Sequence, residues 1–308
     1  MHARQKRYAA ALLFLYVGEW NALCYNNHEL FKKKHKEGER MKGTIIGDII
    51  GSPYEFAKIP VKNKDFVWFA TACHVTDDTV TTIAVAAALQ EGKETRQGYI
   101  GPLRRQLKYW CRLYPNAGFG ARFKQWFMSD EIEPYGSYAN GAAMRVAPAA
   151  WVGQSLDEVQ ALAEITALVT HDNDEAVQGA VAVASAIYLG RMKTPKEEIR
   201  AYLQQYFYPL TQSLDAVRPD YAFTCRTKDS VPQALEAFLE STDFADAINN
   251  AVSLGGDTDT QAAIAGAVAE AYYGVPEALW QQAKAYLPKP MQQVLTAFAA
   301  VYMKEQNQ

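Results

Sequence analysis

Two short acidic segments contain the residue types that most readily bind a metal ion. They are TDDT at residues 76–79 and GGDTDT at residues 255–260, and each directly precedes an apolar, alanine-rich run. One Asp or Thr at such a place is an ordinary N-cap of a helix. Capping accounts for one carboxylate in each segment but leaves the second unexplained, because neither segment has a Lys or Arg within several residues.

Paired carboxylates without a cationic neighbour repel each other and are costly to bury. A metal ion shared by both segments is therefore the favoured interpretation, and paired caps are the alternative. Oxygen ligands suit a hard cation such as Mg²⁺, Mn²⁺ or Ca²⁺ better than zinc. The D-x-D-x-T motif of haloacid-dehalogenase phosphatases is a poorer match, because the threonine falls one position early and the preceding residues, SLGG, are not an apolar strand.

Three further features are candidates for a binding surface. Glu55 follows a turn at Ser52-Pro53, where a rigid corner can hold a carboxylate near a metal ion or a water. Residues 134–146, PYGSYANGAAMRV, combine glycines with polar side chains before another predicted small-residue helix, which suits phosphate binding. His171 lies between two predicted helices. Each feature also has an ordinary structural interpretation: a solvated glutamate, a plain turn and a structural histidine.

The elements that must position these residues are helices. From Met41 onward, apolar residues recur at intervals of three and four, as in DEVQALAEITALVT, DEAVQGAVAVASAIYLG and DTQAAIAGAVAEAYYG. Residues 64–70, KDFVWFA, have the aromatic and β-branched density of a short strand, with a loop as the alternative. The pattern predicts an all-α fold, a single orthogonal helical-bundle domain with long functional loops.

Local signals predict where helices begin and how closely they pack. Ser155 is followed three residues later by Glu158, a capping-box pattern, and Thr194-Pro195 marks the start of a helix that runs to Tyr206. Glycines that recur every four residues allow two helices to approach closely. These glycines are Gly43, Gly47 and Gly51.

The composition is that of a globular protein. The chain has 308 residues, 49% of them hydrophobic, and a formal net charge of −3. This charge argues against general nucleic-acid binding and against binding to an anionic membrane. The four cysteines are scattered and form no C-x-x-C pair, which is typical of a protein in a reducing cytoplasm.

Residues 1–40 differ in character from the rest of the chain. Arg4, Lys6 and Arg7 precede an apolar run from Tyr8 to Val17, which resembles part of a signal peptide but is not followed by a small-x-small cleavage site. We therefore predict an N-terminal extension or extra helix over residues 1–40. The main domain is predicted over residues 41–308.

Five segments, in their order along the chain, resemble the ADP-ribosylglycohydrolase family. The segments are GDIIGSPYE at 47–55, TDDT at 76–79, GSYANGAAMR at 136–145, TH at 170–171 and GGDTDT at 255–260. One acidic tetrapeptide would be a weak signal, whereas five ordered segments are a specific one. The resemblance extends over roughly residues 43–285.

The resemblance implies an all-helical fold around a central dinuclear site with two Mg²⁺ or Mn²⁺ ions. The implied metal ligands are Thr76, Asp77, Asp78, Asp257, Asp259 and Thr260, with Asp259 as the bridging ligand. Glu55 matches a mobile glutamate near the reacting ribose, so that the candidate catalytic carboxylates are Glu55, Asp77 and Asp78. The implied binding residues for the diphosphate and adenosine are Gly136, Ser137, Tyr138, Asn140, Gly141 and His171.

Two departures from the family pattern concern the substrate. No aromatic residue stands at the expected place opposite Tyr138, and Tyr135 and Phe119 are the candidates for that role. His171 is followed by Asp-Asn-Asp, where many relatives have a proline a few residues later. Neither departure affects the acidic segments.

The implied activity is metal-dependent hydrolysis at the anomeric carbon of the ribose, which releases ADP-ribose from a protein, nucleic-acid or small-molecule acceptor. The alternatives are a catalytically silent, ADP-ribose-binding or crystallin-like relative and an unrelated metal-dependent phosphohydrolase. We expect a cytoplasmic enzyme that does not associate with membranes.

Overall fold

A computed structural model describes residues 39–95 and 98–303 of the chain. Throughout these ranges the regular structure is helical and no strand is formed, which confirms the predicted all-α fold. An isolated bridge joins Ala139 to Arg226. The predicted extension, including the run from Tyr8 to Val17, lies outside the described residues except for its last two.

The helices follow one another with connections that are mostly short. In the first half of the chain they are α3 (Lys42–Gly51), α4 (Asp77–Thr95), α5 (Ile100–Leu113), α6 (Ala121–Met128), the 3₁₀ turn η2 (Asn140–Ala142), α7 (Ala147–Val152) and α8 (Leu156–Leu168). In the second half they are α9 (Asp174–Arg191), α10 (Lys196–Tyr206), α11 (Leu214–Val217), α12 (Thr227–Leu239), α13 (Phe244–Val252), α14 (Thr258–Tyr273), α15 (Glu277–Lys284) and α16 (Lys289–Met303).

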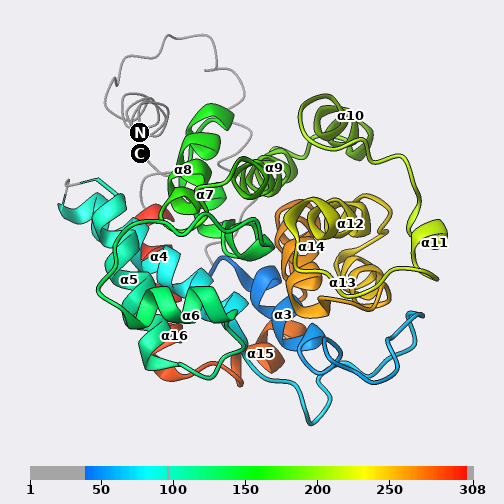
Figure 1. Cartoon of the computed structure of the whole chain (residues 1–308). Helices are drawn as coiled ribbons and strands as arrows, with labels where there is room; N and C mark the ends of the chain where they lie inside the picture. Colours follow the sequence, from blue (N-terminus) through cyan, green and yellow to red (C-terminus); the bar gives the residue numbers. More distant parts are fainter. Residues whose placement is uncertain (1–38, 96–97, 304–308) are drawn as a thin grey trace.

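Helix α14 is the central element, since its side chains are buried from Thr258 to Ala271. It packs against α3, α9, α12 and α13, and Figure 1 shows it in orange between them. The approach to α3 is close enough to require glycine. A Cβ on Gly47 would lie 2.0 Å from the Ala262 carbonyl oxygen, and one on Gly43 would lie 2.0 Å from that of Gly266. The four-residue glycine spacing therefore does bring two helices together.

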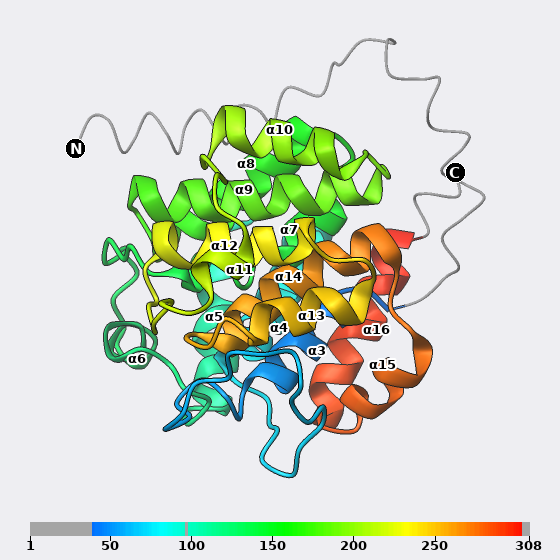
Figure 2. The same ribbon diagram turned by 90° about the vertical axis from the view of Figure 1, so that its right-hand side faces the viewer.

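The helices cross at large angles. In Figure 1, α9, α10 and α13 are seen nearly end-on, and in Figure 2 they are seen lengthwise, so they share a common direction. Helix α6 shows the opposite, because it lies lengthwise in Figure 1 and end-on in Figure 2. Its axis therefore runs across theirs, as expected of an orthogonal bundle.

Residues 64–70 form a loop and not a strand. Their aromatic side chains attach the long α3–α4 connection to the helices instead of building a sheet. The Trp68 indole nitrogen donates to Asn249 Oδ1 at 2.8 Å, and the Phe69 ring lies against Tyr286 at 6.1 Å between centroids. Phe66 makes an edge contact with Tyr54.

Helix starts agree with the sequence signals to within one residue. The Ser155 hydroxyl accepts from the Glu158 N–H and caps α8, while the Glu158 carboxylate accepts from the N–H of Gln154 and not from that of Ser155. Helix α10 ends at Tyr206 as predicted, but Pro195 occupies its N-cap and the first helical residue is Lys196.

A two-glycine turn sets the position of the second acidic segment. Gly255 and Gly256 have φ angles of 58° and 138°, which residues other than glycine rarely adopt. A Cβ on Gly255 would also lie 2.9 Å from Pro60 Cβ. The chain can therefore reverse from α13 into α14 and present Asp257 and Asp259 at the start of the central helix.

Candidate active site

A cavity of about 420 Å³ lies beside the starts of α4 and α14. The rest of its wall comes from the turn after α3, the α5–α6 connection with the start of α6, the loop before η2, the α8–α9 junction and the loop before α12. The predicted site residues that line it are Glu55, Asp77, Asp78, Ser137, Tyr138, Asn140, Gly141, His171, Asp257, Asp259 and Thr260. Thr76 and Gly136, which were also predicted, lie next to this lining and not within it.

The turn after α3 and the start of α14 bring three carboxylates together. Glu55, Asp257 and Asp259 each place an oxygen within 4.8 Å of the other two, an arrangement that could hold a metal ion. Asp257 precedes the first residue of α14 and Asp259 lies in its first turn, where the positive end of the helix dipole favours negative charge.

A hydrogen bond links the two acidic segments. The Thr260 hydroxyl donates to Asp78 Oδ2 at 3.2 Å across a sequence separation of 182 residues. On the other side, the Asn140 amide donates to Asp257 Oδ2 at 2.7 Å and to Ser230 Oγ at 3.2 Å. The predicted binding segment and the two acidic segments thus form one connected site.

The carboxylates have strongly perturbed pKa values. Burial, followed by the neighbouring Asp259, raises the pKa of Glu55 to about 9. The same two causes raise the pKa values of Asp77 and Asp78 well above the ordinary value of 3.8. Burial also raises the pKa of Asp259. Without a cation, this site therefore takes up protons to neutralise its charge.

The donor set fits a hard metal ion. Asp78 is 1% exposed, and its Oδ1 atom is buried without a hydrogen-bond partner. Such an orphaned charged oxygen is costly unless a ligand satisfies it. The surrounding atoms are carboxylate and hydroxyl oxygens, which are the ligands that Mg²⁺ and Mn²⁺ prefer.

Asp48 is a buried acid that sequence reasoning missed. It lies inside α3 with no exposed surface and accepts from the Thr76 N–H, the Thr76 hydroxyl at 2.7 Å and the Thr79 N–H. Burial, followed by Asp259, raises its pKa to about 7. The available signal was a lone Asp in the otherwise apolar run GTIIGDIIG. Asp48 fixes Thr76 beneath the cavity and so holds the start of α4.

A cation also reaches the cavity wall, although none is near the acidic segments in sequence. Arg145 is 1% exposed and lies close enough to Asp77 for its charge to oppose the raised pKa of that carboxyl. Its guanidinium donates to the Thr166 carbonyl and to the Thr170 hydroxyl, and no carboxylate accepts a hydrogen bond from it in the described part of the chain. The acidic segments are therefore not neutralised by a direct ion pair.

The polar segment at residues 134–146 forms a turn that leads into a small-residue helix, as expected. Gly136 has a φ of 64°, and the Ser137 hydroxyl accepts from the N–H of Ala139. The single 3₁₀ turn η2 lies within the segment, and the small-residue helix α7 begins at Ala147, directly after it. Residues 137–141 of this segment therefore line the cavity as a small polar turn ahead of α7.

Of the two residues considered as aromatic partners of Tyr138, one lines the cavity and the other does not. The Tyr138 ring is 53% exposed at the mouth, and Tyr135 lines the cavity beside His171, with ring centroids 6.0 Å apart. Phe119 instead packs against Phe123 and Phe127 and is not part of the lining. Of the two candidates, only Tyr135 is placed to meet a ligand.

Two exposed phenylalanines at the mouth were not predicted. Phe56, next to Glu55, is 77% exposed and Phe223 is 49% exposed, yet their ring centroids are 5.5 Å apart. Both line the cavity. A contact between distant loops leaves no periodic signal in the sequence, so it could not be anticipated.

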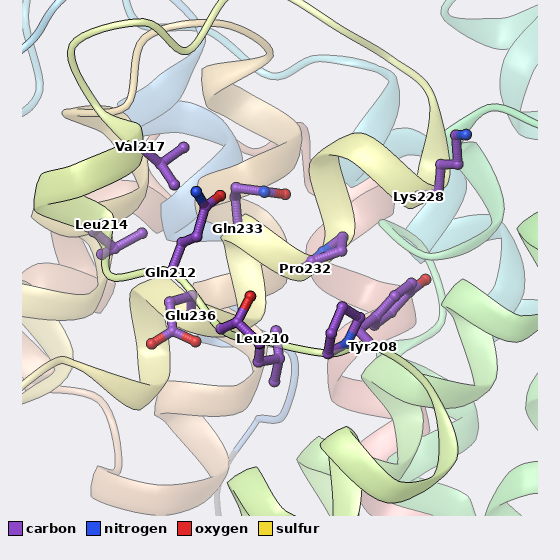
Figure 3. A pocket seen from close by; sticks show the side chains of 11 residues that line it. Tyr208, Leu210, Gln212, Leu214, Val217, Lys228, Pro232, Gln233 and Glu236 are labelled. Carbon is purple, nitrogen blue, oxygen red and sulfur yellow. The ribbon is translucent and has the colours of Figure 1, made fainter.

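A second, smaller cavity of about 170 Å³ lies between α11, α12 and the loop that follows α10 (Figure 3). Its acidic residue, Glu236, is paired with Arg200 through two hydrogen bonds of 2.6 and 2.8 Å. None of its lining residues belongs to the acidic segments. The larger cavity is therefore the candidate active site.

Within the described residues, no helix combines the length and apolar character that crossing a membrane requires.

Comparison with known proteins agrees with this site. The sequence model of the ADP-ribosylglycohydrolase family matches residues 40–308. Human ADP-ribosylhydrolase ARH3 is 27% identical over 320 residues, covering 79% of this chain and 87% of ARH3. ADP-ribosylarginine hydrolase Tri1 of Pseudomonas putida (strain GB-1) is 28% identical over 268 residues, covering 77% of this chain and 71% of Tri1. A solved ADP-ribosylglycohydrolase-related protein complex has the same fold, with a TM-score of 0.61 at 22% identity over 86% of this chain and 97% of the solved chain. The chain belongs to the ADP-ribosylglycohydrolase family.

Proposed function

We propose that this protein is a metal-dependent hydrolase that cleaves the bond at the anomeric carbon of an ADP-ribosylated acceptor and releases ADP-ribose. The observation that carries the proposal is the buried acidic site, in which Glu55, Asp257 and Asp259 converge and Asp78 has an unpartnered oxygen. Two relatives described as ADP-ribosylhydrolase and ADP-ribosylarginine hydrolase support the same reaction class.

Two Mg²⁺ or Mn²⁺ ions are the proposed cofactors. The proposed ligands are Thr76, Asp77, Asp78, Asp257, Asp259 and Thr260. When bound, such ions orient hydroxyl groups and lower the pKa of a water. This proposal is supported by the oxygen-rich donor set and by the orphaned Asp78 oxygen.

The side chains of the site have separate proposed roles in proton transfer and in substrate binding. Asp77 and Asp78 are the proposed proton acceptors, and Glu55, on a turn at the edge of the cavity, is proposed to assist them or to control entry. Gly136, Ser137, Tyr138, Asn140, Gly141 and His171 are the proposed binding residues for the diphosphate and adenosine. The hydrogen bond from Asn140 to Asp257 supports this arrangement, because it joins the binding segment directly to the acidic site.

The main alternative is a catalytically silent protein that binds ADP-ribose or has a crystallin-like structural role. The retained acidic residues favour the hydrolase, because buried carboxylates are costly and serve no evident purpose in a silent protein. We propose residues 41–308 as the functional domain and residues 1–40 as an extension. A cytoplasmic location is proposed on the unpaired thiols of Cys73, Cys111 and Cys225.

The test is to incubate the purified full chain with ADP-ribosylated arginine peptide, serine peptide and nucleic-acid ends, with Mg²⁺ or Mn²⁺ and then with chelator. Free ADP-ribose is measured. Metal-dependent release from one substrate supports the hydrolase and identifies the acceptor. Binding of ADP-ribose without release from any substrate supports the silent alternative, and absence of both contradicts the proposal.

A further inference from the structure

Three buried side chains form a hydrogen-bonded row in the cavity wall. Arg145 is 1% exposed, Thr170 has no exposed surface and His171 is 2% exposed. Arg145 Nη2 donates to the Thr170 hydroxyl oxygen at 2.6 Å, and this oxygen lies 2.7 Å from His171 Nδ1. Arg145 and Thr170 were not among the predicted site residues.

The protons of this row can be assigned by counting donors and acceptors. A guanidinium only donates, so the Thr170 oxygen must be the acceptor of the bond from Arg145. A hydroxyl has a single hydrogen, and His171 Nδ1 is the one acceptor within reach of it among the described residues. Nδ1 is therefore the unprotonated nitrogen. In a neutral imidazole the proton then resides on Nε2.

The Nε2 atom faces the space beside Gly141. It lies 3.3 Å from the position that a Cβ on Gly141 would occupy, and the absence of that side chain leaves room next to it. His171 and Gly141 both line the cavity. No residue in the described part of the chain accepts a hydrogen bond from Nε2, so this donor is available to a ligand.

The charge state of His171 agrees with this assignment. Burial, followed by the positive charge of Arg145, lowers the pKa of His171 well below its ordinary value of 6.5. A neutral His171 that donates from Nε2, with the positive charge of Arg145 nearby, is suited to bind an anionic or hydroxyl oxygen and is unsuited to bind a cationic group.

We infer that Arg145 and Thr170 are positioning residues that hold His171 as a neutral Nε2–H donor, aimed at an acceptor oxygen of the bound ligand. The inference rests on the proposed function for the identity of that ligand, whose oxygen belongs to the diphosphate or a ribose of ADP-ribose. It also excludes His171 as a general base, because its free nitrogen is already occupied by the Thr170 hydroxyl.

The tautomer is tested on the free protein, so this experiment does not depend on the proposed function. The full chain is labelled with ¹⁵N-histidine, and the ring nitrogens are observed by long-range ¹H–¹⁵N NMR, with His171→Gln used for assignment. The inference predicts an unprotonated Nδ1 and a protonated Nε2 at neutral pH. A protonated Nδ1, in either the other tautomer or an imidazolium, overturns the inference.

The positioning role is tested with ADP-ribose and a matched pair of variants. Thr170→Val keeps the shape but removes the hydroxyl, whereas Thr170→Ser retains it. We expect Thr170→Val to weaken ADP-ribose binding by about tenfold, or about 1.4 kcal/mol, and to lose the single Nε2–H tautomer, because the hydrogen bond from Nε2 to the charged ligand is no longer held in place. Thr170→Ser is expected to bind like the wild type.

Equal affinity of Thr170→Val and the wild type for ADP-ribose, measured by calorimetry on folded protein, overturns the positioning role. If Thr170→Val does not fold, the wild-type tautomer still decides the inference. If the wild type itself does not bind ADP-ribose but shows the predicted tautomer, the proposed function fails and the Arg145–Thr170–His171 arrangement stands.

Discussion

At the scale of single residues, the proposed chemistry depends on carboxylates that play unequal parts. Asp259 is the neighbouring charge that contributes most to the raised pKa values of Asp77 and Asp78. Glu55 lies farther out, on a turn at the edge of the cavity. We therefore expect different outcomes when each is removed.

Asp259→Ala is expected to be nearly inactive, because it removes a proposed metal ligand that lies between the other carboxylates of the site. Glu55→Ala is expected to lose about 10²–10³-fold in kcat/KM and to remain measurable, which is within the range of a lost proton-transfer group. Asp65→Ala, in an exposed loop, serves as the control and should match the wild type. Equal residual activity of Asp259→Ala and Glu55→Ala in an ADP-ribose release assay would contradict the proposed roles.

Glu270 makes the free energy of unfolding depend on pH, and this effect is separate from that of the acidic site. Its carboxylate accepts from the Gly43 N–H at 2.8 Å, and burial raises its pKa to about 7 against the partly compensating hydrogen bond and Arg40. Because the folded pKa exceeds the unfolded one, the folded state holds a proton that the unfolded state has lost. The contribution of Glu270 to stability is therefore largest below the unfolded pKa of 4.5 and falls as pH rises to about 7.

Glu270→Gln keeps the acceptor but cannot ionise. We compare the free energy of unfolding of this variant with that of the wild type at each pH. The difference, variant minus wild type, is expected to increase by about 3 kcal/mol from pH 4.5 to pH 7 or above. Urea denaturation at several pH values in chelator measures this difference. The acidic site contributes equally to both proteins, so a constant difference across the range would show that Glu270 does not titrate there.

At the scale of elements, the contact between α3 and α14 holds the acidic site together. Gly47→Ala favours a helix by up to about 1 kcal/mol through its backbone propensity. The added Cβ, however, would lie 2.0 Å from the Ala262 carbonyl oxygen and 2.3 Å from its carbon, and backbone atoms cannot move aside cheaply. Overpacking therefore outweighs propensity.

Gly47→Ala is expected to reduce the free energy of unfolding by about 3 kcal/mol or more. Gly101→Ala is the matched control, because Gly101 is exposed in the first turn of α5 and a Cβ there meets only the flexible Arg105 side chain at 3.3 Å. That control should be neutral or slightly stabilising. Similar urea midpoints for both variants would refute the close helix contact.

The turn that carries Glu55 is fixed on both sides. The Tyr54 hydroxyl donates to the Val67 carbonyl at 2.7 Å, and Phe56 lies against Phe223. Phe223 belongs to a loop whose later residues are bonded to the binding segment, since the Cys225 carbonyl accepts from the Asn140 N–H. The two loops therefore connect Glu55 to the proposed ligand-binding wall.

Phe223→Ala is expected to lower kcat by about three- to tenfold, which corresponds to the 0.5–1.5 kcal/mol of an aromatic pair. The melting temperature should change little, because both rings are largely exposed. Phe223→Tyr retains the ring and should keep wild-type kcat. An unchanged kcat in Phe223→Ala would mean that the contact does not position Glu55.

At the scale of the whole molecule, metal binding is expected to stabilise the fold. The acidic site joins α3, α4 and α14, which are far apart in the sequence, and its carboxylates repel one another unless a cation is bound. A ligand of the folded state at 100 times its Kd adds about 2.7 kcal/mol. Mg²⁺ or Mn²⁺ should raise the melting temperature of chelator-treated protein by several degrees.

Asp259→Ala should lose this thermal shift, and NaCl of equal ionic strength should not reproduce it in the wild type. A shift of the same size with NaCl, or an undiminished shift in Asp259→Ala, would indicate general screening of charge and not a bound ion.

The sequence determined the class of fold and most of the candidate site. Apolar periodicity depends on neighbours three and four residues apart, so the helices could be predicted from local sequence. The glycine spacing of α3 also predicted its close packing against another helix. The acidic segments were visible because two carboxylates stand together without a cation. The sequence left a strand and a loop as alternatives for residues 64–70, because aromatic residues are common in strands but can also anchor a loop. In the structure they anchor a loop.

Only the tertiary structure decided which distant residues meet. Asp48 joins Thr76, Arg145 joins Thr170, and Phe56 joins Phe223, across sequence separations that leave no periodic trace. The last of these contacts arises because the loops before α4 and α12 meet at the cavity beside the start of α14. Burial then raises the pKa values of the carboxylates and lowers that of His171, because both effects depend on the exclusion of water.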